Sequence, residues 1–297
     1  MRLRDSFHPY AAVTILFWSF AYVLTRLSLQ YFSAFSLGFL RYLTASCVLA
    51  AVAVLTRMKP PRRKDGLWFL AAGGLGFFLY MILFNQGQAV VTAATGSVVI
   101  AAVPVITALF ARIVYREKLR VYQWTAIVTA FSGVAVLALM NSALSVNQGL
   151  VWLFLAALSL SAYNLLQRKL TKTYSALQTS AYSIFCGTLL LAVFAPSSFR
   201  ALVHAPPVQL VYLGILGVCS SAVAYVSWAK AFSVAAQTSQ VSNYMFVTPF
   251  LTSILGFVLA GEVPDPATLI GGGIILTGLA IFHFGGTIFG PFRHRND

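Results

Sequence analysis

The chain repeats itself at an offset of 145 residues. Six residues of the first half recur as the same residue type in the second half, as the pairs Tyr80 and Tyr225, Ser97 and Ser242, Pro104 and Pro249, Thr107 and Thr252, Glu117 and Glu262, and Gly133 and Gly278. Each repeat holds five apolar stretches, and since five is an odd number, the second repeat would enter a bilayer from the opposite face. Two inverted repeats share a pseudo-twofold axis in the membrane plane, an arrangement typical of transporters that alternate access between the two faces.

The composition predicts that these stretches lie in a lipid bilayer. Hydrophobic residues make up 59% of the chain and charged residues 9%, whereas an average soluble domain carries roughly 25% charged residues. A helix of about 20 apolar residues crosses the hydrocarbon core, and a backbone in lipid must satisfy its own hydrogen bonds. The sequence therefore predicts an all-α integral membrane protein with ten transmembrane helices, arranged as inverted five-helix repeats over residues 1–146 and 147–297 of one bundle. The predicted spans are 8–29, 35–56, 66–87, 95–115, 121–140, 148–167, 175–195, 208–229, 240–260 and 267–289.

The distribution of the basic residues predicts the orientation of the chain. The formal net charge of +14 would by itself be compatible with nucleic-acid binding. With the N-terminus inside, however, most Lys and Arg residues fall at cytoplasmic ends of the predicted helices, as the positive-inside rule requires. Arg200 falls in an outside loop, and Arg26 and Arg41 fall near the outer ends of the first two helices. We therefore expect a multi-pass protein of the cell (inner) membrane with both termini cytoplasmic, and no nucleic-acid partner.

Two prolines are candidate hinges. Pro104 and Pro249 lie near the middle of the fourth and ninth predicted helices. A proline in a helix removes one backbone hydrogen bond and bends the helix, here at the carbonyls of Ile100 and Met245. A carbonyl without its usual donor at mid-membrane depth must face protein, water or a ligand, so the two prolines are predicted to flank the transport pathway.

Two further pairs at equivalent positions are candidate gates. Asn85 lies toward the outer end of the third helix, and Lys230 lies 145 positions later, toward the inner end of the eighth. We predict that these two residues sit at opposite gates. Glu117 and Glu262 end the two proline-containing helices, each just before the next helix, where the helix dipole favours a carboxylate. For this pair a structural role and a direct gate are both open.

Uncharged polar and aromatic residues inside the helices are the candidate substrate contacts. No Asp or Glu falls inside a predicted span, so the buried carboxylate that proton-coupled carriers commonly use is absent, and a facilitator is favoured. Aromatic walls with a few amides and hydroxyls suit a modest organic solute. The alternative for the Trp and Tyr residues is an interfacial belt. The predicted substrate-binding residues are Trp18, Tyr22, Tyr80, Ser97, Tyr163, Asn164, Tyr225, Trp228, Ser242 and Tyr244.

A family resemblance adds to this interpretation. The residues that carry it are Ala89 to Ala94 ahead of Pro104 and Glu117, Arg41, Ala231-Phe232, Gln240-Val241-Ser242, Pro249, Gly256 and Gly261-Glu262. With them the chain resembles the ten-helix EamA-type carriers of the drug/metabolite transporter superfamily, and among these it is most similar to the YddG-type amino-acid exporters. The resemblance implies a central cavity among helices 1, 3, 4, 6, 8 and 9, with helices 5 and 10 at the periphery.

The expected function is export of amino acids, aromatic and other neutral ones, by alternating access. The sequence has no Walker motif, so we expect transport without ATP. A drug or other small-metabolite exporter of the same superfamily is the main alternative. An intramembrane enzyme is a distant one, because the four histidines are scattered and no GxSxG motif is present. We expect no enzymatic activity, no cofactor and no metal site; the expected partners are a small-molecule substrate, namely an amino acid, and the lipid bilayer.

Overall fold

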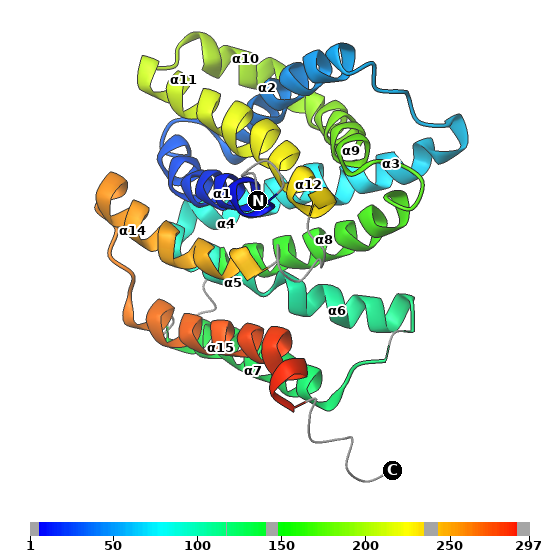
Figure 1. Ribbon diagram of the computed structural model, residues 1–297. Coiled ribbons are helices and arrows are strands. Elements are labelled where there is room, and N and C mark those ends of the chain that lie inside the picture. Colours follow the sequence, from blue (N-terminus) through cyan, green and yellow to red (C-terminus); the bar gives the residue numbers. More distant parts are fainter. Residues whose placement is uncertain (1–5, 117, 141–147, 235–242, 290–297) are drawn as a thin grey trace.

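The computed structural model describes residues 6–116, 118–140, 148–234 and 243–289. Every regular element in this part of the chain is a helix (Figure 1), which confirms the predicted all-α class. The α-helices are α1 (His8–Ser28), α2 (Ala34–Leu55), α3 (Gly66–Gly73), α4 (Tyr80–Val90), α5 (Ala93–Ala101), α6 (Val103–Val114), α7 (Val121–Met140), α8 (Gln148–Leu170), α9 (Ala176–Leu191), α10 (Ala195–Val203), α11 (Pro207–Gly214), α12 (Ala224–Val234), α14 (Thr248–Ala260) and α15 (Pro266–Phe289). Short 3-10 helices are η2 (Arg63–Asp65), η4 (Ala192–Phe194) and η6 (Asn243–Val247), and π-helices are η3 (Gly74–Leu79) and η5 (Ile215–Val223).

Nine helical stretches within the described residues are long and apolar enough to cross a membrane. They match nine of the ten predicted spans. Four of them run through several elements. Arg63–Val90 joins η2, α3, η3 and α4, and Ala93–Val114 joins α5 and α6. Ala176–Val203 joins α9, η4 and α10, and Pro207–Trp228 joins α11, η5 and part of α12. The tenth predicted span, 240–260, lies partly outside the described residues, and its described apolar helix, Thr248–Ala260, is shorter. The chain is therefore a multi-pass helical membrane protein.

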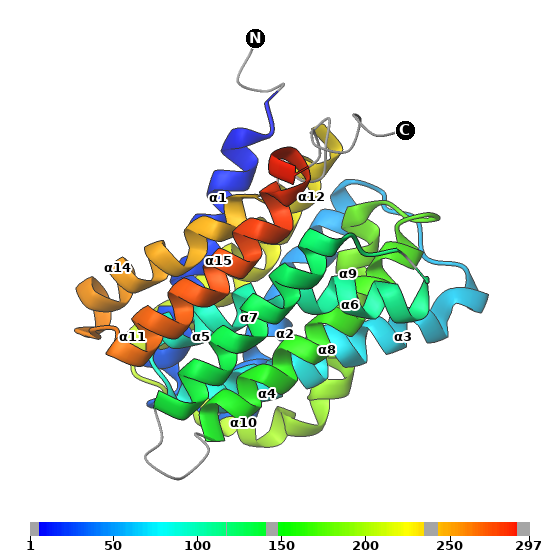
Figure 2. The same ribbon diagram turned by 90° about the horizontal axis from the view of Figure 1, so that it is seen from below.

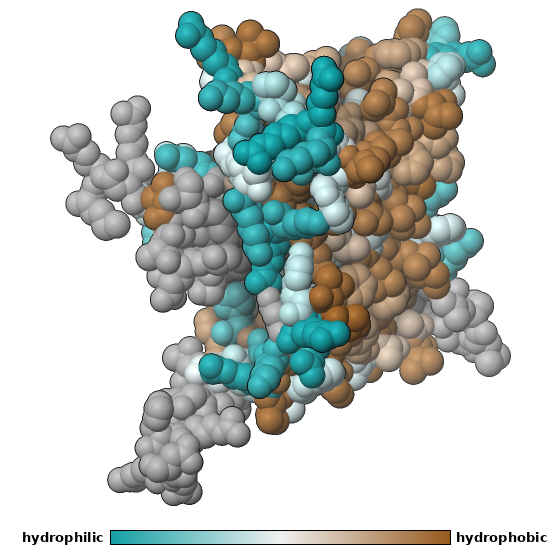
Figure 3. All heavy atoms as spheres, turned by 90° about the vertical axis from the view of Figure 1, so that its right-hand side faces the viewer, coloured by the Kyte–Doolittle hydropathy of each residue, from teal (hydrophilic) through white to brown (hydrophobic). Residues whose placement is uncertain are grey.

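Large apolar side chains cover much of the outside of the bundle. Figure 3 shows a broad hydrophobic area on one face, with hydrophilic residues gathered mostly to one side of it. On α14, at the other side of the bundle (left in Figure 1), the side chains of Phe250, Ile254 and Phe257 are all more than half exposed. A soluble monomer rarely exposes large continuous apolar patches, so this surface is suited to contact with lipid.

Helices α7 and α15 lie side by side at one edge of the bundle (Figure 1, Figure 2). Small residues let their backbones approach closely. A Cβ added to Gly133 would lie 2.7 Å from the carbonyl oxygen of Gly271, and one added to Gly278 would lie 2.7 Å from the backbone nitrogen of Ala130. Glycine contacts of this kind hold helices together where lipid provides no hydrophobic drive for association. The fifth and tenth membrane helices are thus peripheral, as expected.

The two halves of the chain interlock. Helix α1 of the first half packs against α12 and α14 of the second, and α8 of the second half packs against α4 and α6 of the first. Equivalent serines begin equivalent helices: Ser33 accepts a hydrogen bond from the backbone N–H of Ser36 at the start of α2, and Ser175 accepts one from Gln178 at the start of α9. The predicted boundary between the repeats, 146/147, lies outside the described residues, so that division stays a prediction.

Both predicted hinge prolines lie in the first turn after an interruption of the helix. Helix α5 ends at Ala101 and α6 begins at Val103, with Pro104 in its first turn. Pro249 has the same place in α14, which follows the 3-10 helix η6. Proline lacks the N–H that would continue the hydrogen-bond ladder, and its ring clashes with the preceding turn. Their role as hinges remains a prediction.

The carbonyls immediately before the two prolines make equivalent contacts between the halves. Ser161 of α8 donates to the carbonyl oxygen of Val103 at 3.3 Å, and Ser19 of α1 donates to that of Thr248 at 3.5 Å. Each serine hydroxyl also hydrogen-bonds the carbonyl four residues earlier in its own helix. The sequence predicts that the carbonyls four residues before each proline lose their usual donor; the carbonyls next to the prolines, which it did not single out, are the ones that bridge the halves here.

Candidate functional site

A group of aromatic residues meets inside the bundle, and we call it the central aromatic cluster. Its rings come from α1, α2, η3, α4, α8 and α12, and thus from both halves of the chain. Aromatic rings present flat apolar faces together with a few polar atoms, the kind of surface that binds organic solutes. The members are Trp18, Tyr22, Tyr42, Phe77, Tyr80, Phe84, Tyr163, Tyr225 and Trp228.

Phe77 joins the two halves within this cluster. Its ring centroid lies 5.3 Å from that of Tyr42, 5.1 Å from that of Tyr163 and 5.9 Å from that of Tyr225. The first two pairs are edge-to-face and the third is tilted, and offset or edge-to-face geometries are the favourable ones for aromatic pairs. A buried ring from the first half is therefore held by two rings from the second.

The two π-helices precede the equivalent tyrosines of the cluster. Tyr80 follows η3 directly, and Tyr225 follows η5 after one residue. A π-helical turn accommodates an extra residue relative to an α-helical turn, and such turns occur often at functional sites. The sequence predicted both tyrosines as substrate contacts, but its apolar pattern gave no sign of either π-helix.

Trp18 and Trp228 extend the cluster along α1 and α12. Tyr22, Tyr80 and Phe84 form a second set of ring contacts, and the phenols of Tyr22 and Tyr80 interact electrostatically with that of Tyr225. The centroids of Trp18 and Trp228 are 5.1 Å apart, those of Tyr22 and Phe84 are 5.4 Å apart, and those of Tyr80 and Phe84 are 5.5 Å apart. Trp18, Tyr80 and Trp228 keep part of their surface exposed, whereas Tyr22 is buried. The structure thus brings together six of the ten predicted substrate-binding residues, namely Trp18, Tyr22, Tyr80, Tyr163, Tyr225 and Trp228.

Two other predicted polar contacts lie along α5 and α8. The hydroxyl of Ser97 is buried and donates to the carbonyl oxygen of Ala94 at 2.7 Å, within its own helix. The amide of Asn164 donates to the hydroxyl of Thr107 at 3.2 Å and thereby links α8 to α6. Both side chains are engaged in helix contacts in this structure, and their role in substrate binding stays a prediction.

Tyr244 lies at the end of the bundle that holds the start of α1. Its hydroxyl is 2.6 Å from Nδ1 of His8, and its ring packs edge-on against that of Phe7. This contact joins η6 to α1. Tyr244 packs against the same buried residues, Ala11 and Ala231, as Trp228 of the central aromatic cluster. Ser242, the remaining predicted substrate contact, lies outside the described residues.

Arg41 is a functional candidate that the sequence did not include among the predicted site residues. It lies in the first half of α2 and is 6% exposed, and its Nε donates to the hydroxyl of Ser221 in η5 at 2.9 Å. Its guanidinium carbon lies 5.9 Å from the ring centroid of Tyr42, and its charge interacts electrostatically with the phenol groups of Tyr22 and Tyr225. The sequence does contain a sign of its importance: Arg41 is a lone charge in an otherwise uncharged apolar helix. Such a charge is energetically costly in a membrane, so its presence indicates a function.

The carboxylates of the described residues are engaged away from this guanidinium. Asp65 accepts a hydrogen bond from the Tyr174 hydroxyl at 2.6 Å, which raises the pKa of that phenol above its ordinary value. Glu262 pairs with Arg26, and Asp265 accepts from a backbone N–H at the start of α15 at 2.6 Å. Arg41 therefore has no ion-pair partner among the residues that the structure describes.

The ion pair between Arg26 and Glu262 connects the end of α1 with α4, with α5 and with the segment that follows α14. Arg26 Nε lies 3.1 Å from an oxygen of Glu262, which follows α14, and Arg26 Nη1 donates to the carbonyl oxygens of Gln88 and Ala89 at the end of α4. The second oxygen of Glu262 accepts from the backbone N–H of Ala93 at 2.8 Å, at the start of α5. Arg26 and Glu262 belong to different halves of the chain, so this ion pair connects the two halves at that end of the bundle.

The two predicted gate residues have unlike surroundings. Asn85 is fully buried, and its amide donates to the carbonyl oxygen of Ala34 at 2.8 Å, so it ties α4 to the start of α2. Lys230 is exposed on α12. They lie on equivalent helices of the two halves, and their assignment to opposite gates stays a prediction.

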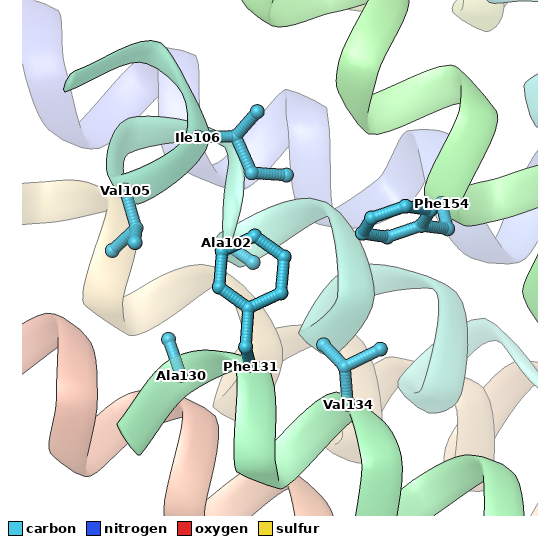
Figure 4. A pocket seen from close by; sticks show the side chains of 7 residues that line it. All are labelled: Ala102, Val105, Ile106, Ala130, Phe131, Val134 and Phe154. Carbon is cyan, nitrogen blue, oxygen red and sulfur yellow. The ribbon is translucent and has the colours of Figure 1, made fainter. Parts of the chain in front are cut away.

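A small pocket lies beside the break between α5 and α6, apart from the aromatic cluster. The space not filled by atoms in it is about 190 Å³, and this figure includes open solvent. The seven side chains that line it are all apolar and come from α6, α7, α8 and the break itself (Figure 4): Ala102, Val105, Ile106, Ala130, Phe131, Val134 and Phe154. It offers no polar group for the charged ends of an amino acid.

Comparison with known proteins finds the same family across the chain. The model of the EamA-like transporter family matches residues 7–139 and 147–284. A probable terminal-alkyne amino-acid exporter of Streptantibioticus cattleyicolor is 28% identical over 91% of both chains. The uncharacterized transporter YdfC of Bacillus subtilis is 29% identical over 88% of this chain and 86% of its own. An S-adenosylmethionine uptake transporter of Rickettsia prowazekii is 25% identical over 82% of this chain and 80% of its own.

A solved crystal structure has a similar fold. It matches with a TM-score of 0.60 at 19% sequence identity, and the match covers 94% of this chain and 97% of that one. At this identity the likeness concerns the fold alone.

Proposed function

Because the chain belongs to the EamA-like transporter family, we propose that it exports amino acids, aromatic and other neutral ones, across the cell inner membrane by alternating access. The observation that carries this proposal is the central aromatic cluster, in which ring faces, phenol hydroxyls and one buried guanidinium meet between the two halves of the chain. Ring faces suit an aromatic or aliphatic side chain, and the polar groups suit the charged head of a zwitterion.

Two relatives with named solutes support an amino-acid head group. One is named a probable exporter of a terminal-alkyne amino acid, and the other an uptake transporter of S-adenosylmethionine. Both solutes contain an α-amino carboxylate, although the two names give opposite directions of transport. We propose that the solute of this chain carries the same head group, and that it leaves the cell.

The contacts between the halves support an alternating mechanism. Arg26 and Glu262 hold the two halves together at one end of the bundle. This end lies opposite the start of α1 and the end of α15 (Figure 2). With both termini in the cytoplasm, as we propose, the described state is closed toward the outside. Opening outward would break this ion pair, while the contact of Tyr244 with His8 would hold the opposite end.

The proposed transport is facilitated and needs no ATP. No Asp or Glu lies within the described α-helices, so the buried carboxylate with which proton-coupled carriers commonly bind their proton is missing from them. The family and its named relatives are transporters, which supports transport in place of catalysis. The solute would then run down its own gradient in whichever direction that gradient points.

Counterflow in proteoliposomes tests the proposal. Purified protein is reconstituted with unlabelled phenylalanine, tryptophan, leucine or methionine inside, and uptake of the labelled amino acid is followed with and without an imposed proton gradient. We expect exchange for one or more of these amino acids at a rate that the proton gradient does not change. Exchange that requires the gradient would refute the facilitator, and absence of exchange for every amino acid would refute the substrate class.

The alternative function is a drug or other small-metabolite exporter of the same superfamily. The broad aromatic surface of the cluster would also accommodate an apolar solute. A buried positive charge repels a cationic drug, however, so Arg41 favours a solute with an anionic group. Exchange of cationic dyes without exchange of amino acids would establish the alternative.

A further inference from the structure

We propose that Arg41 binds the carboxylate of the transported solute, which assigns an anion site to the inside of the bundle. The inference rests on the proposed amino-acid transport and deepens it, because it names the group that is recognised and the residue that recognises it. It applies to carboxylate-bearing solutes as a class, with α-amino acids as the expected members.

The first support is a buried charge without a counter-charge. Arg41 is the one charged residue of α2 and is 6% exposed. A guanidinium stays protonated in proteins, and charges within a membrane are kept where they pair with one another or serve a pathway. Within the described part of the chain, no carboxylate forms an ion pair with Arg41, because Asp65, Glu262 and Asp265 are engaged elsewhere. A bound anionic solute would supply the counter-charge that Arg41 lacks among these residues.

The second support is the way in which the guanidinium is held. Its Nε donates to Ser221 Oγ at 2.9 Å, and the Ser221 hydroxyl donates its own proton to the carbonyl oxygen of Leu216 at 3.0 Å. The serine lone pairs are thereby turned toward Arg41, so Ser221 is a positioning residue. No other hydrogen bond joins the Arg41 side chain to the residues that the structure describes.

The donors that remain match a carboxylate. A guanidinium carries five N–H donors in a planar fork, and four of them belong to the two terminal nitrogens. Two parallel N–H groups fit the two oxygens of a carboxylate, which is the geometry that makes arginine the preferred partner of planar anions. Ser221 leaves this pair of nitrogens available by engaging Nε alone.

The third support is the set of groups around the charge. The phenols of Tyr22, Tyr80 and Tyr225 are close enough to interact with it electrostatically, and the Tyr42 ring centroid lies 5.9 Å from its central carbon. Phenol hydroxyls donate to carboxylate oxygens, and ring faces attract an ammonium. The same neighbourhood therefore provides partners for both charges of an α-amino acid and apolar contact for its side chain.

The site spans both halves of the chain. Arg41 lies on α2 of the first half and Ser221 on η5 of the second, and these two elements pack against each other. A carboxylate bound to the guanidinium would lie at the contact between the halves. Its release would therefore accompany their relative movement, as alternating access requires.

A comparison of matched ligands tests the inference. Binding of L-phenylalanine, of L-phenylalaninol, which lacks the carboxylate, and of 3-phenylpropionate, which lacks the ammonium, is measured by tryptophan fluorescence on purified full-length protein. The variants are Arg41→Gln, Arg41→Lys and Ser221→Ala. Arg200→Gln, on the exposed surface of α10, is the control, and a melting curve for each variant reports folding.

We expect Arg41→Gln to weaken binding of phenylalanine and of 3-phenylpropionate about 10- to 100-fold, the effect of losing a charge-assisted hydrogen-bonded pair. Binding of phenylalaninol, which is a cation, should not weaken and should strengthen to the extent that the repulsion by the guanidinium is removed. Arg41→Lys should keep part of the preference for carboxylates, because it keeps the charge without the fork. Ser221→Ala should weaken binding of both carboxylates less than Arg41→Gln does, and Arg200→Gln should behave as the wild type.

The outcomes separate this inference from the proposed function. If Arg41→Gln weakened all three ligands equally, or none, the arginine would have a structural role and the inference would be wrong. If the wild type bound no carboxylate, the inference would also be wrong. If 3-phenylpropionate bound in an Arg41-dependent way but no amino acid were bound or exchanged, the anion site would stand and the proposed amino-acid transport would fall.

Discussion

Neutralising Arg26 should open the outer end of the bundle. In the structure its Nε lies 3.1 Å from an oxygen of Glu262, and its Nη1 donates to the carbonyl oxygens of Gln88 and Ala89. The substitution Arg26→Gln removes the charge and shortens the side chain, so these contacts are lost while the rest of α1 is kept. The state that is closed at this end should lose stability relative to the open state.

The size of the effect follows from the exposure of the pair. The side chain of Arg26 is 30% exposed and that of Glu262 is 16% exposed. The pair is therefore worth more than a fully exposed pair, for which the median is about 0–1 kcal/mol, and solvent screens it more than a buried one. We expect a loss of about 1–3 kcal/mol, which would raise the ratio of open to closed molecules about 5- to 150-fold.

Cysteine labelling from the outside measures this shift. The reporter is Ser97→Cys in a protein whose native cysteines are replaced by serine. Ser97 is buried and lies one helical turn from Ala93, the residue whose N–H donates to Glu262. When opening and closing are fast, the rate of reaction with a membrane-impermeant maleimide follows the fraction of open molecules. While nearly all molecules are closed, this fraction rises by the same factor as the ratio, so the rate should rise about 5- to 150-fold; the rise is smaller once the open state becomes a large share.

Two controls accompany the measurement. Arg200→Gln, a neutralised arginine at the exposed surface of α10, should leave the labelling rate unchanged. The double variant of Arg26→Gln and Glu262→Gln should label no faster than the faster single variant, because both remove the same pair. Equal labelling rates in Arg26→Gln and the parent protein would refute the reasoning.

Substituting Gly278 by Ala should lower the melting temperature in detergent, with an overpacking cost of about 1–3 kcal/mol, because its Cβ would meet a backbone nitrogen at 2.7 Å; Gly273→Ala, with nothing within 4 Å, should not. Lys230→Ala should change the transport rate without changing melting, because Lys230 is exposed; unchanged uptake and efflux would contradict its role at a gate. Tyr174→Phe should speed tryptic cleavage of the loop between α2 and α3, because its hydrogen bond to Asp65 is lost. The pKa of Tyr174 is raised above its ordinary value of about 10. In the wild type the hydrogen bond is therefore kept below about pH 10 and is lost as the pH rises through the raised pKa. Wild-type cleavage that accelerated well below about pH 10 would contradict this account.

The repeat carried most of what the sequence could predict. Apolar stretches of membrane length located the helices, and matching residues at one offset paired Tyr80 with Tyr225, both of which lie in the central aromatic cluster. Such a prediction works because repeats related by duplication keep the residues that meet near their common axis. The offset also paired Pro104 with Pro249, and each lies just after an interrupted helix.

Contacts distant in sequence account for what could not be predicted. Arg41 and Ser221 are 180 positions apart, and Arg26 and Glu262 are 236 positions apart. The sequence placed Arg41 near the outer end of the second helix, but it could not show that neighbouring helices bury its side chain. The π-helices could not be predicted because the extra residue in a π-helical turn does not change the apolar character of the stretch from which the helix was predicted.

The central claim is that two five-helix repeats cross the membrane in opposite senses around a shared site. Single cysteines at Lys64, before α3, and at Gln148, at the start of α8, test it most directly, because both positions are exposed and they are predicted to lie on opposite faces. In right-side-out vesicles, an impermeant maleimide should label Gln148→Cys at once and Lys64→Cys only after the membrane is opened. Labelling of both positions from the same side would contradict the inverted arrangement and the alternating mechanism built on it.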